Sequence, residues 1–123
     1  MALLRAFARH ASRRQLFVPV QFLEGGTTPE EIFAGQTSTR LVNALGMLRT
    51  RAREHLEAFE SALVHVPPAA MPAFLPVALV PGYLSVMNRP DYDPFKTAVE
   101  VAQWRRQWAL WRAARRWSRA MRG

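Results

Sequence analysis

The 123-residue chain contains no cysteine, a single lysine (Lys96) and only two aspartates (Asp91 and Asp93). Without cysteine, disulfides, thiolate zinc sites and a cysteine nucleophile are excluded. The two aspartates stand two positions apart in a segment between prolines, so they cannot form a same-face DxxxD pair on a helix. Acids in such a turn ordinarily accept hydrogen bonds from nearby backbone amides.

Common catalytic motifs are absent as well. His10, His55 and His65 do not have metal-ligand spacing, and the chain contains no HExxH, no nucleophile elbow and no glycine-rich phosphate loop. The longest apolar run considered, residues 73–81, is short and carries two prolines, so we expect no membrane span. Half of the residues are hydrophobic and a fifth are charged, which predicts one folded domain over residues 1–123.

Arginine is the abundant charged residue. Sixteen arginines and one lysine face nine acids, which gives a net charge of +8. Planar guanidinium groups suit phosphate and carboxylate. An acidic partner is therefore expected: nucleic acid, an anionic membrane face, a diphosphate or an acidic protein surface. A base-composition bias of the genome is the alternative explanation.

The first 14 residues contain no acid and place arginines four positions apart at Arg5, Arg9 and Arg13, with apolar residues on another side. Mitochondrial presequences have this pattern. A first helix cut short on its N-terminal side explains it equally well, and patterned sequence continues from it without a break.

Helix signals are strong in the first half. The stretch TTPEE (residues 27–31) combines a threonine N-cap, proline at the first helical position and acids in the first turn. A loop at Gly25–Gly26 precedes this short helix, and Gly35 ends it. A long helix follows from about Thr39 to Val64, because leucines and other apolar residues recur at three- and four-residue steps.

The second half alternates apolar and polar segments. Residues 69–86 are apolar on all sides and contain three prolines, which predicts one or two short buried helices bent at the prolines. Residues 88–95 form a turn-rich loop. The last helix is expected over residues 97–122, with Thr97 and Glu100 as a capping box. The predicted class is all-α, with at most a token pair of short strands near Phe17.

The last helix carries the most conspicuous side chains. Tryptophans spaced three and four apart fall along one stripe, and the apolar side is widened by Leu110, Ala114, Trp117 and Met121. Arginines are expected on the opposite side. The surface so predicted comprises Trp104, Trp108, Trp111, Arg105, Arg112, Arg116 and Arg119.

That surface has three interpretations. A basic amphipathic helix can bind an anionic membrane or a partner protein. The simpler interpretation packs the tryptophans into the protein's own bundle and leaves the arginines solvated. Nucleic acid is disfavoured, because stacking platforms interleave aromatics with arginines whereas here the two are predicted on separate faces.

Four segments together resemble the C-terminal part of the squalene/phytoene synthase family. They are LLRAFARHASRRQLFVPVQF, RAREHLEAF, PAFLPVALVPGYL and DPFKTAVEVAQWRRQWALWRAAR. The resemblance covers about residues 3–115. The run HASRRQLFVP is especially similar to the non-catalytic branch that contains the mitochondrial complex I assembly factor and its bacterial relatives. This resemblance implies a partial isoprenoid-synthase-type helical bundle.

Catalytic members of that family hold Mg²⁺ with two aspartate-rich motifs, because ionising an allylic diphosphate develops negative charge that hard cations must neutralise. The resemblance places the first motif upstream of this chain and the aspartates of the second near Ala6 and His10, which cannot act as carboxylate ligands. Arg13, Arg14 and Phe17 match the basic and aromatic positions that follow, which implies a residual phosphate-binding corner. We therefore expect no catalytic residue, no metal ligand and no cofactor, with Mg²⁺ only if another chain completes the site.

Three functions follow from these expectations. The preferred one is a non-catalytic scaffold or assembly factor that binds a protein partner or itself, or a prenyl lipid. The second is the C-terminal half of a prenyl-diphosphate condensing synthase, completed by another chain. The third is a basic adaptor that uses the last helix on a membrane or nucleic acid. The expected location is cytoplasmic, in contact with the inner membrane face.

Size also predicts association. Four or five helices cannot close a ring around a prenyl cavity while also burying the apolar run from Phe74 to Leu84. Part of the apolar surface should stay exposed, which favours self-association or a protein partner.

Overall fold

The computed structural model describes residues 1–23 and 27–120. The expected loop at Gly25–Gly26 and the expected helical residues Met121 and Arg122 lie outside this range. Over the described residues the structure is helical and contains no strand, which confirms the all-α class. The expected strand pair near Phe17 is therefore wrong: Leu16 and Val18 pack against an apolar cluster, while Phe17 is 51% exposed.

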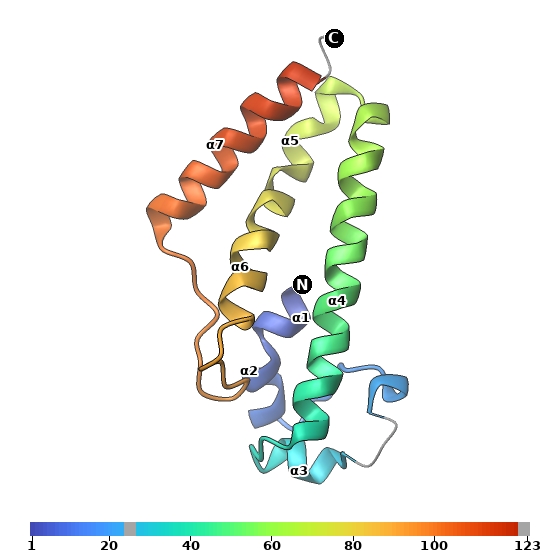
Figure 1. Ribbon diagram of the computed structural model, residues 1–123, viewed down its shortest axis with the longest axis vertical. Helices are drawn as coiled ribbons and strands as arrows, with labels where there is room; N and C mark the ends of the chain where they lie inside the picture. The colour runs from blue at the N-terminus through green and yellow to red at the C-terminus, as the bar shows by residue number, and fades with distance from the viewer. Residues whose placement is uncertain (24–26, 121–123) are drawn as a thin grey trace.

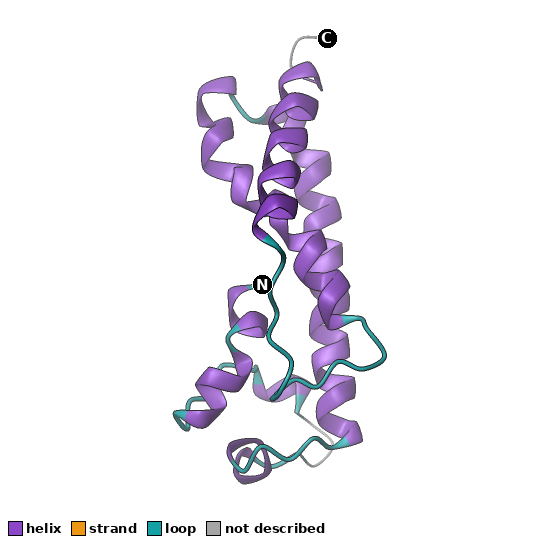
Figure 2. Ribbon diagram, turned by 90° about the vertical axis from the view of Figure 1, so that its left-hand side faces the viewer, coloured by secondary structure: helices purple, strands orange, loops and turns teal. Residues whose placement is uncertain are grey.

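The helices divide the molecule into a long upper part and a lower end (Figure 1). In the upper part, a segmented rod made of α5, η4 and α6 lies between α4 and α7. The short N-terminal helices gather at the end where α4 begins, as Figure 2 also shows. The elements are α1 (Ala2–Arg5), α2 (Phe7–Ser12), η1 (Val20–Phe22), α3 (Pro29–Phe33), α4 (Thr39–Ala62), η2 (Leu63–His65), η3 (Pro68–Ala70), α5 (Met71–Phe74), η4 (Leu75–Leu79), α6 (Val80–Met87) and α7 (Gln103–Ala120).

The predicted start and end of α3 are confirmed. The Thr28 hydroxyl accepts a hydrogen bond from the Glu31 amide at 3.3 Å, and the Thr28 amide donates to the Glu31 carboxylate at 3.2 Å, which completes a capping box. Beyond the last turn, Gly35 has a φ of +70°, a left-handed conformation that glycine adopts without steric cost.

The long helix α4 also matches its prediction closely. Its N-cap is Ser38, whose hydroxyl accepts a hydrogen bond from the Leu41 amide at 3.1 Å. At its other end the last turn tightens into η2, and Val66 before Pro67 is extended. The pre-proline residue is pushed out of the helical region, as expected.

The rod after α4 is segmented by its prolines. Each helical piece from η3 through α6 has a proline in its first turn, where the missing amide would have had no helical partner: Pro68, Pro72, Pro76 and Pro81. The rod is less buried than predicted. Residues 68–87 are long and apolar enough to cross a membrane by length and composition, and 28% of the most apolar 18 consecutive residues in this stretch are buried.

This finding corrects the expectation that no segment reaches the length of a membrane span. The run at residues 73–81 is short and interrupted by prolines, but the apolar stretch extends beyond it, because no acid, lysine or arginine occurs between Glu60 and Arg89. A core helix of a soluble protein meets the same criterion of length and composition, so the segment has both interpretations.

The last helix begins later than predicted. Thr97 does not cap it: the Thr97 hydroxyl accepts a hydrogen bond from the Asp93 amide at 2.9 Å and so closes the preceding turn. The Asp93 carboxylate accepts from the Phe95 amide at 2.8 Å, the local role expected for an acid in this loop. Val99 is buried, so the chain stays non-helical until α7 begins at Gln103.

Apolar side chains of the described residues form three separate cores. The N-terminal core comprises Phe7, Ala11, Ile32, Leu41 and Leu45. The Tyr83 core comprises Tyr83, Val86, Met87 and Val99. The α7 core comprises Leu63, Met71, Ala113 and Trp117. Helix α4 contributes to the first through its N-terminal turns, and to the third through Phe59.

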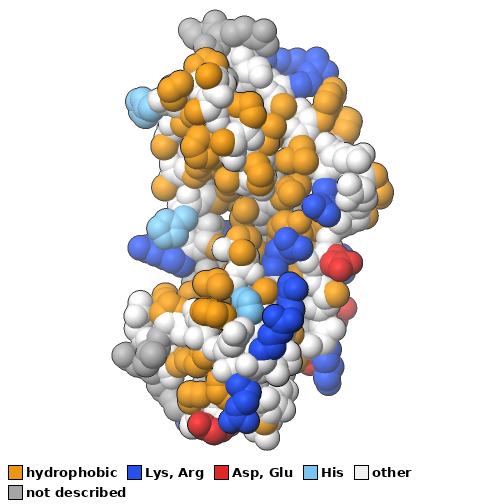
Figure 3. All heavy atoms as spheres, turned by 180° about the vertical axis from the view of Figure 1, so that it is seen from behind, with side chains coloured by type: hydrophobic (Ala, Val, Ile, Leu, Met, Phe, Trp, Pro, Cys, Tyr) orange, Lys and Arg blue, Asp and Glu red, His pale blue; other side chains and the backbone are white. Residues whose placement is uncertain are grey.

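Considerable apolar surface is left uncovered, as the small number of helices predicts. Figure 3 shows hydrophobic side chains gathered over the upper half of the molecule. The large hydrophobic side chains that are exposed are Leu3, Phe17, Val42, Met47, Val64, Trp104, Trp108 and Trp111. Exposed patches of this kind mark surfaces for partners or membranes.

Tyr92 lies in the loop before α7, and its titration tests how this loop packs against Arg49 of α4. Burial raises the pKa of Tyr92; the Arg49 guanidinium, 5.8 Å from its ring centre, opposes the shift, and the Asp93 charge adds to it. We expect Arg49→Gln to raise the Tyr92 pKa further. The folded state then holds its phenol proton above the pH at which the unfolded chain releases it, so the free energy of unfolding should fall as pH rises beyond about 10.

Ultraviolet titration of phenolate absorbance measures this shift, and the difference spectrum against Tyr92→Phe isolates its signal. A Tyr92 pKa that falls in Arg49→Gln would contradict the contact.

Candidate functional site

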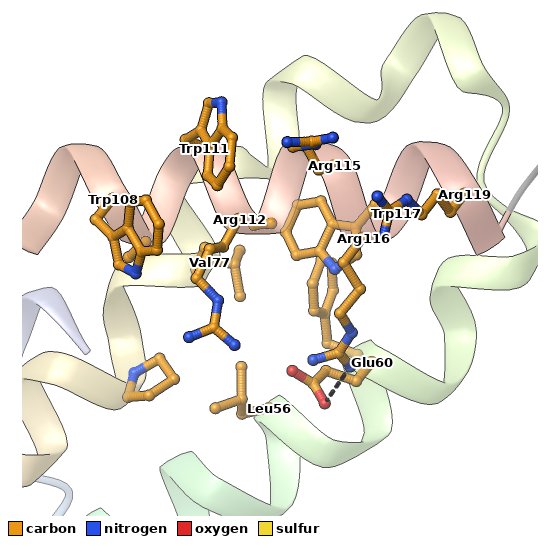
Figure 4. Close-up of a pocket in the computed structure, with 15 residues that line it drawn as sticks. Leu56, Glu60, Val77, Trp108, Trp111, Arg112, Arg115, Arg116, Trp117 and Arg119 are labelled. Carbon is orange, nitrogen blue, oxygen red and sulfur yellow. Dashed lines mark hydrogen bonds and ion pairs between the residues drawn. The ribbon is translucent and has the colours of Figure 1, made fainter.

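A groove of about 610 Å³ runs along α7. Its apolar floor and far wall come from α4, η4 and α6 through Leu56, Phe59, Val77, Ala78 and Pro81. Its near wall is α7, from Trp108 to Arg119 (Figure 4). We call this feature the α7 groove.

Helix α7 is fastened to the bundle by its C-terminal half. Trp117 is 5% exposed, and its ring meets Phe59 edge-on with 6.0 Å between centroids. One turn earlier Ala113 is also buried. The Arg116 guanidinium and the Glu60 carboxylate form an ion pair at 3.2 Å across the groove (Figure 4). Apolar packing and one bridging ion pair therefore set the position of α7.

The other three tryptophans of α7 face solvent. Trp104, Trp108 and Trp111 are 65%, 53% and 48% exposed. Trp108 and Trp111 stack on one another with ring centroids 4.9 Å apart. The interpretation that the tryptophans pack into the bundle is therefore right for Trp117 and wrong for these three.

The arginines lie beside the exposed tryptophans rather than opposite them. At about 100° per residue, Arg112 falls roughly 80° from Trp104, whereas Trp117 falls roughly 140° away on the buried side. The Arg105 guanidinium lies 5.1 Å from the ring centre of Trp104. A further arginine that the sequence analysis missed, Arg115, lies 4.7 Å from that of Trp111.

This arrangement corrects the predicted separation of aromatic and basic faces. It also removes the argument against nucleic acid that rested on that separation, because the two kinds of side chain interleave here.

The charge of this surface is of one sign. Between Gln103 and Ala120 the sequence contains six arginines and no acid. Among the described residues, Arg116 is the α7 arginine that has an acidic partner. The Arg112 side chain points into the groove (Figure 4). An apolar groove bordered by unneutralised guanidinium groups suits a ligand with an apolar part and an anionic part.

The residues predicted to form a phosphate corner are only partly brought together. Phe17 lines a pocket of about 240 Å³, and its ring meets that of His10 edge-on at 4.8 Å. Arg13 is exposed, and the Arg14 guanidinium lies 5.4 Å from the Phe33 ring centre; neither arginine lines the pocket. Phosphate binding by Arg13, Arg14 and Phe17 stays a prediction.

Two side chains from α4 that the sequence analysis did not connect with this pocket do line it. They are Arg51 and His55, and their spacing of four residues places them on one face of the helix. Arg51 also forms an ion pair with Glu54 at 2.8 Å, so its charge is partly neutralised. The helical spacing could have associated the pair, but nothing in the sequence indicated that this face meets Phe17.

The family model for squalene/phytoene synthase matches residues 1–112. The chain belongs to the squalene/phytoene synthase family. The family assignment agrees with the all-α fold.

Two mammalian proteins of one name are among those similar to this chain. The rat protein "NADH dehydrogenase (ubiquinone) complex I, assembly factor 6" is 30% identical over 98 residues, which are 79% of this chain and 29% of that protein. The human protein of the same name is 28% identical over the same coverage. The chain thus spans less than a third of the length of these relatives. No solved structure matches it.

Members of the squalene/phytoene synthase family that catalyse condensation need Mg²⁺, and the residues present here do not fit that ion. Ala6 lies between α1 and α2, and His10 packs on Phe17. No acid occurs before Glu24. In the described part of the chain, no group of three or more histidine, aspartate or glutamate side chains is placed to hold a metal ion. Mg²⁺ requires carboxylate oxygens in near-octahedral geometry, which these residues cannot supply.

Proposed function

We propose that this member of the squalene/phytoene synthase family is a non-catalytic scaffold that assists the assembly of a protein complex, and that its client is an NADH dehydrogenase of the complex I type. The observation that carries the proposal is the chemistry of α1 and α2. The helical region expected to hold metal ligands offers Arg5, Arg9 and His10 but no carboxylate. The name of the relatives supports the choice of client.

The exposed apolar surface supports a scaffold role. On α4, Val42 and Met47 are 40% and 57% exposed and lie beside Phe22, so an apolar patch is available to a protein partner. A partner protein that covers this patch would remove its apolar area from water, which stabilises association. We place the role on the cytoplasmic side, at the inner membrane face.

The catalytic part of the proposal is tested with the purified full chain, Mg²⁺ and farnesyl or geranylgeranyl diphosphate. We expect no squalene, no phytoene and no release of diphosphate, because no carboxylate-held cation can neutralise the leaving group. An active synthase of the family assayed in parallel is the control. Product formed by this chain alone would refute the proposal.

The client is tested in the source organism. We expect deletion of the gene to reduce the amount of assembled NADH dehydrogenase on native gels, while an unrelated respiratory complex stays constant. Complementation with Met47→Glu should fail, because a charge placed in the apolar patch opposes docking. Ser61→Glu, an exposed polar position on the same helix, is the matched control. An unchanged amount of the complex after deletion would exclude this client.

A half-enzyme is the second candidate, because the family to which the chain belongs is named for squalene and phytoene synthases. It requires a second chain that supplies the aspartate-rich helices. Turnover that appears only when such a chain is added would support it, whereas a stable monomer that stays inactive with that chain would exclude it.

A further inference from the structure

The one-sided charge of α7 favours an anionic partner. Its six arginines and the absence of acids would make two copies of this helix repel each other, so self-association through this face is disfavoured. Among the ion pairs of the described residues, the one that joins α7 to another helix is Arg116 with Glu60, and it neutralises one of the six. Guanidinium groups that border the α7 groove, among them Arg112 and Arg119, are left to meet phosphate or carboxylate from outside the molecule.

The exposed tryptophans favour a partner that offers both an apolar and a hydrated polar region. Trp104, Trp108 and Trp111 are each about half exposed or more, although a tryptophan side chain can bury on the order of 200 Å² of surface. An indole has an apolar body and one N–H donor, and it concentrates at the boundary between lipid headgroups and acyl chains. Arginines beside it then reach the lipid phosphates.

The composition of the groove favours a bilayer over nucleic acid as the partner. Its floor, at Val77, Ala78 and Pro81, belongs to the stretch between Glu60 and Arg89 that contains no acid, lysine or arginine. Nucleic acid is bound chiefly through its phosphates, and its bases gain from stacking on aromatic faces rather than from the aliphatic side chains of this floor. A lipid acyl chain does gain, because burial removes its methylene groups from water.

We propose that the α7 groove and the adjoining tryptophans form a docking face for a bilayer that contains anionic phospholipid. The arginines along α7 contact lipid phosphates, and the three exposed indoles lie in the interface. An acyl segment of a bound lipid occupies the apolar floor of the groove. The chain is thereby held parallel to the membrane along α7, as a peripheral protein. This inference goes beyond the membrane location proposed above, because it names the surface and the lipid class, and it does not depend on the identity of the client complex.

The test uses the full chain and vesicles of defined composition. Binding is measured by flotation with phosphatidylcholine vesicles and with phosphatidylcholine–phosphatidylglycerol vesicles, at low and high salt. We expect binding to the anionic vesicles that weakens as salt rises, and little to the neutral ones. Failure to bind anionic vesicles at low salt, with circular dichroism showing the helical fold intact, would overturn the proposal.

Charge removal on α7 tests the surface itself. A variant that combines Arg112→Gln, Arg115→Gln and Arg119→Gln should bind anionic vesicles on the order of 100-fold more weakly, since each arginine near the surface contributes about fivefold. Arg116 is spared because of its ion pair with Glu60. The matched control removes three exposed arginines elsewhere: Arg5→Gln, Arg9→Gln and Arg40→Gln. An equal loss in both variants would contradict an α7 face.

Tryptophan fluorescence tests insertion. Lipids brominated in their acyl chains should quench Trp104, Trp108 and Trp111, while the buried Trp117 serves as an internal reference. The double variant Trp108→Ala, Trp111→Ala should keep its salt-sensitive binding but lose most of the quenching. Unquenched emission from the bound wild type would refute insertion. Tighter binding to duplex DNA or RNA than to anionic vesicles at the same salt would favour nucleic acid and overturn the proposal.

Discussion

Replacing Trp117 by alanine is expected to lower the free energy of unfolding by about 3–5 kcal/mol, the range for truncating a large aromatic in a core. Trp117 is 5% exposed and packs with Leu63, Met71 and Ala113, and edge-on against Phe59. Its loss leaves a cavity where α7 meets α4 and the rod. A single domain has about 5–15 kcal/mol of stability in total, so this one change removes a large share.

Urea denaturation followed by circular dichroism measures the effect. Trp104→Ala is the matched control: the same atoms are deleted from the same helix, but at a side chain that is 65% exposed, so a change within about 0.5 kcal/mol is expected. Equal destabilisation by the two variants would mean that the buried and exposed faces of α7 are wrongly assigned.

Ile32→Ala is the second large effect, with an expected loss of about 2–5 kcal/mol. Ile32 is fully buried in the N-terminal core, although it comes from the five-residue helix α3. A helix of this length has little stability of its own. Its position therefore depends on the Ile32 side chain and on the Thr28 capping box. Loss of the side chain should release α3 from α2 and α4 as well as leave a cavity.

The conservative variant Ile32→Val, with an expected loss of about 0.5–1.5 kcal/mol, separates methylene loss from release of α3. Limited proteolysis at residues 27–38 reports the release directly and should accelerate in Ile32→Ala only. Because Ile32 and Trp117 belong to different cores, their effects should add to within about 0.5 kcal/mol in the double variant. A larger deviation would indicate that α4 couples the two cores.

The parts of this fold that the sequence predicts correctly are the local ones. The capping residues of α3, the length of α4 and the end of α4 before Pro67 depend on chemistry within a few residues, and each is confirmed. The predicted start of α7 is wrong because Thr97 can act in two ways. It can cap a helix, or its hydroxyl can accept a hydrogen bond from the Asp93 amide and close a turn. Burial of Val99 favours the second use, and burial is not visible in the local sequence.

The buried face of α7 is a second feature that the sequence does not predict. Periodicity correctly groups Trp104, Trp108 and Trp111 on one stripe, but it cannot say whether that stripe faces the bundle. The bundle instead takes the side of Ala113 and Trp117, because small Ala113 allows close approach and Trp117 fills the space above Phe59. Which side is buried is decided by segments far away in the sequence.

The candidate sites also combine features that the sequence predicts with features that only the folded chain shows. The absence of aspartates in register could be read directly, and so could the arginine and tryptophan content of α7. The α7 groove could not, because its floor and its walls come from separate segments that meet only in the folded chain. The approach of Arg51 and His55 to Phe17 is tertiary for the same reason.

The way in which α7 is attached has a mechanical consequence. Its first turns, at residues 103–108, are exposed on every side, whereas Ala113, Trp117 and the Arg116–Glu60 pair hold the second half. Transient opening therefore begins at the end nearest residue 103 and stops where Ala113 is buried. Amide protons there exchange through a local event that leaves the rest of the molecule folded. Helix α7 is thus anchored by its C-terminal half, and its N-terminal turns open first.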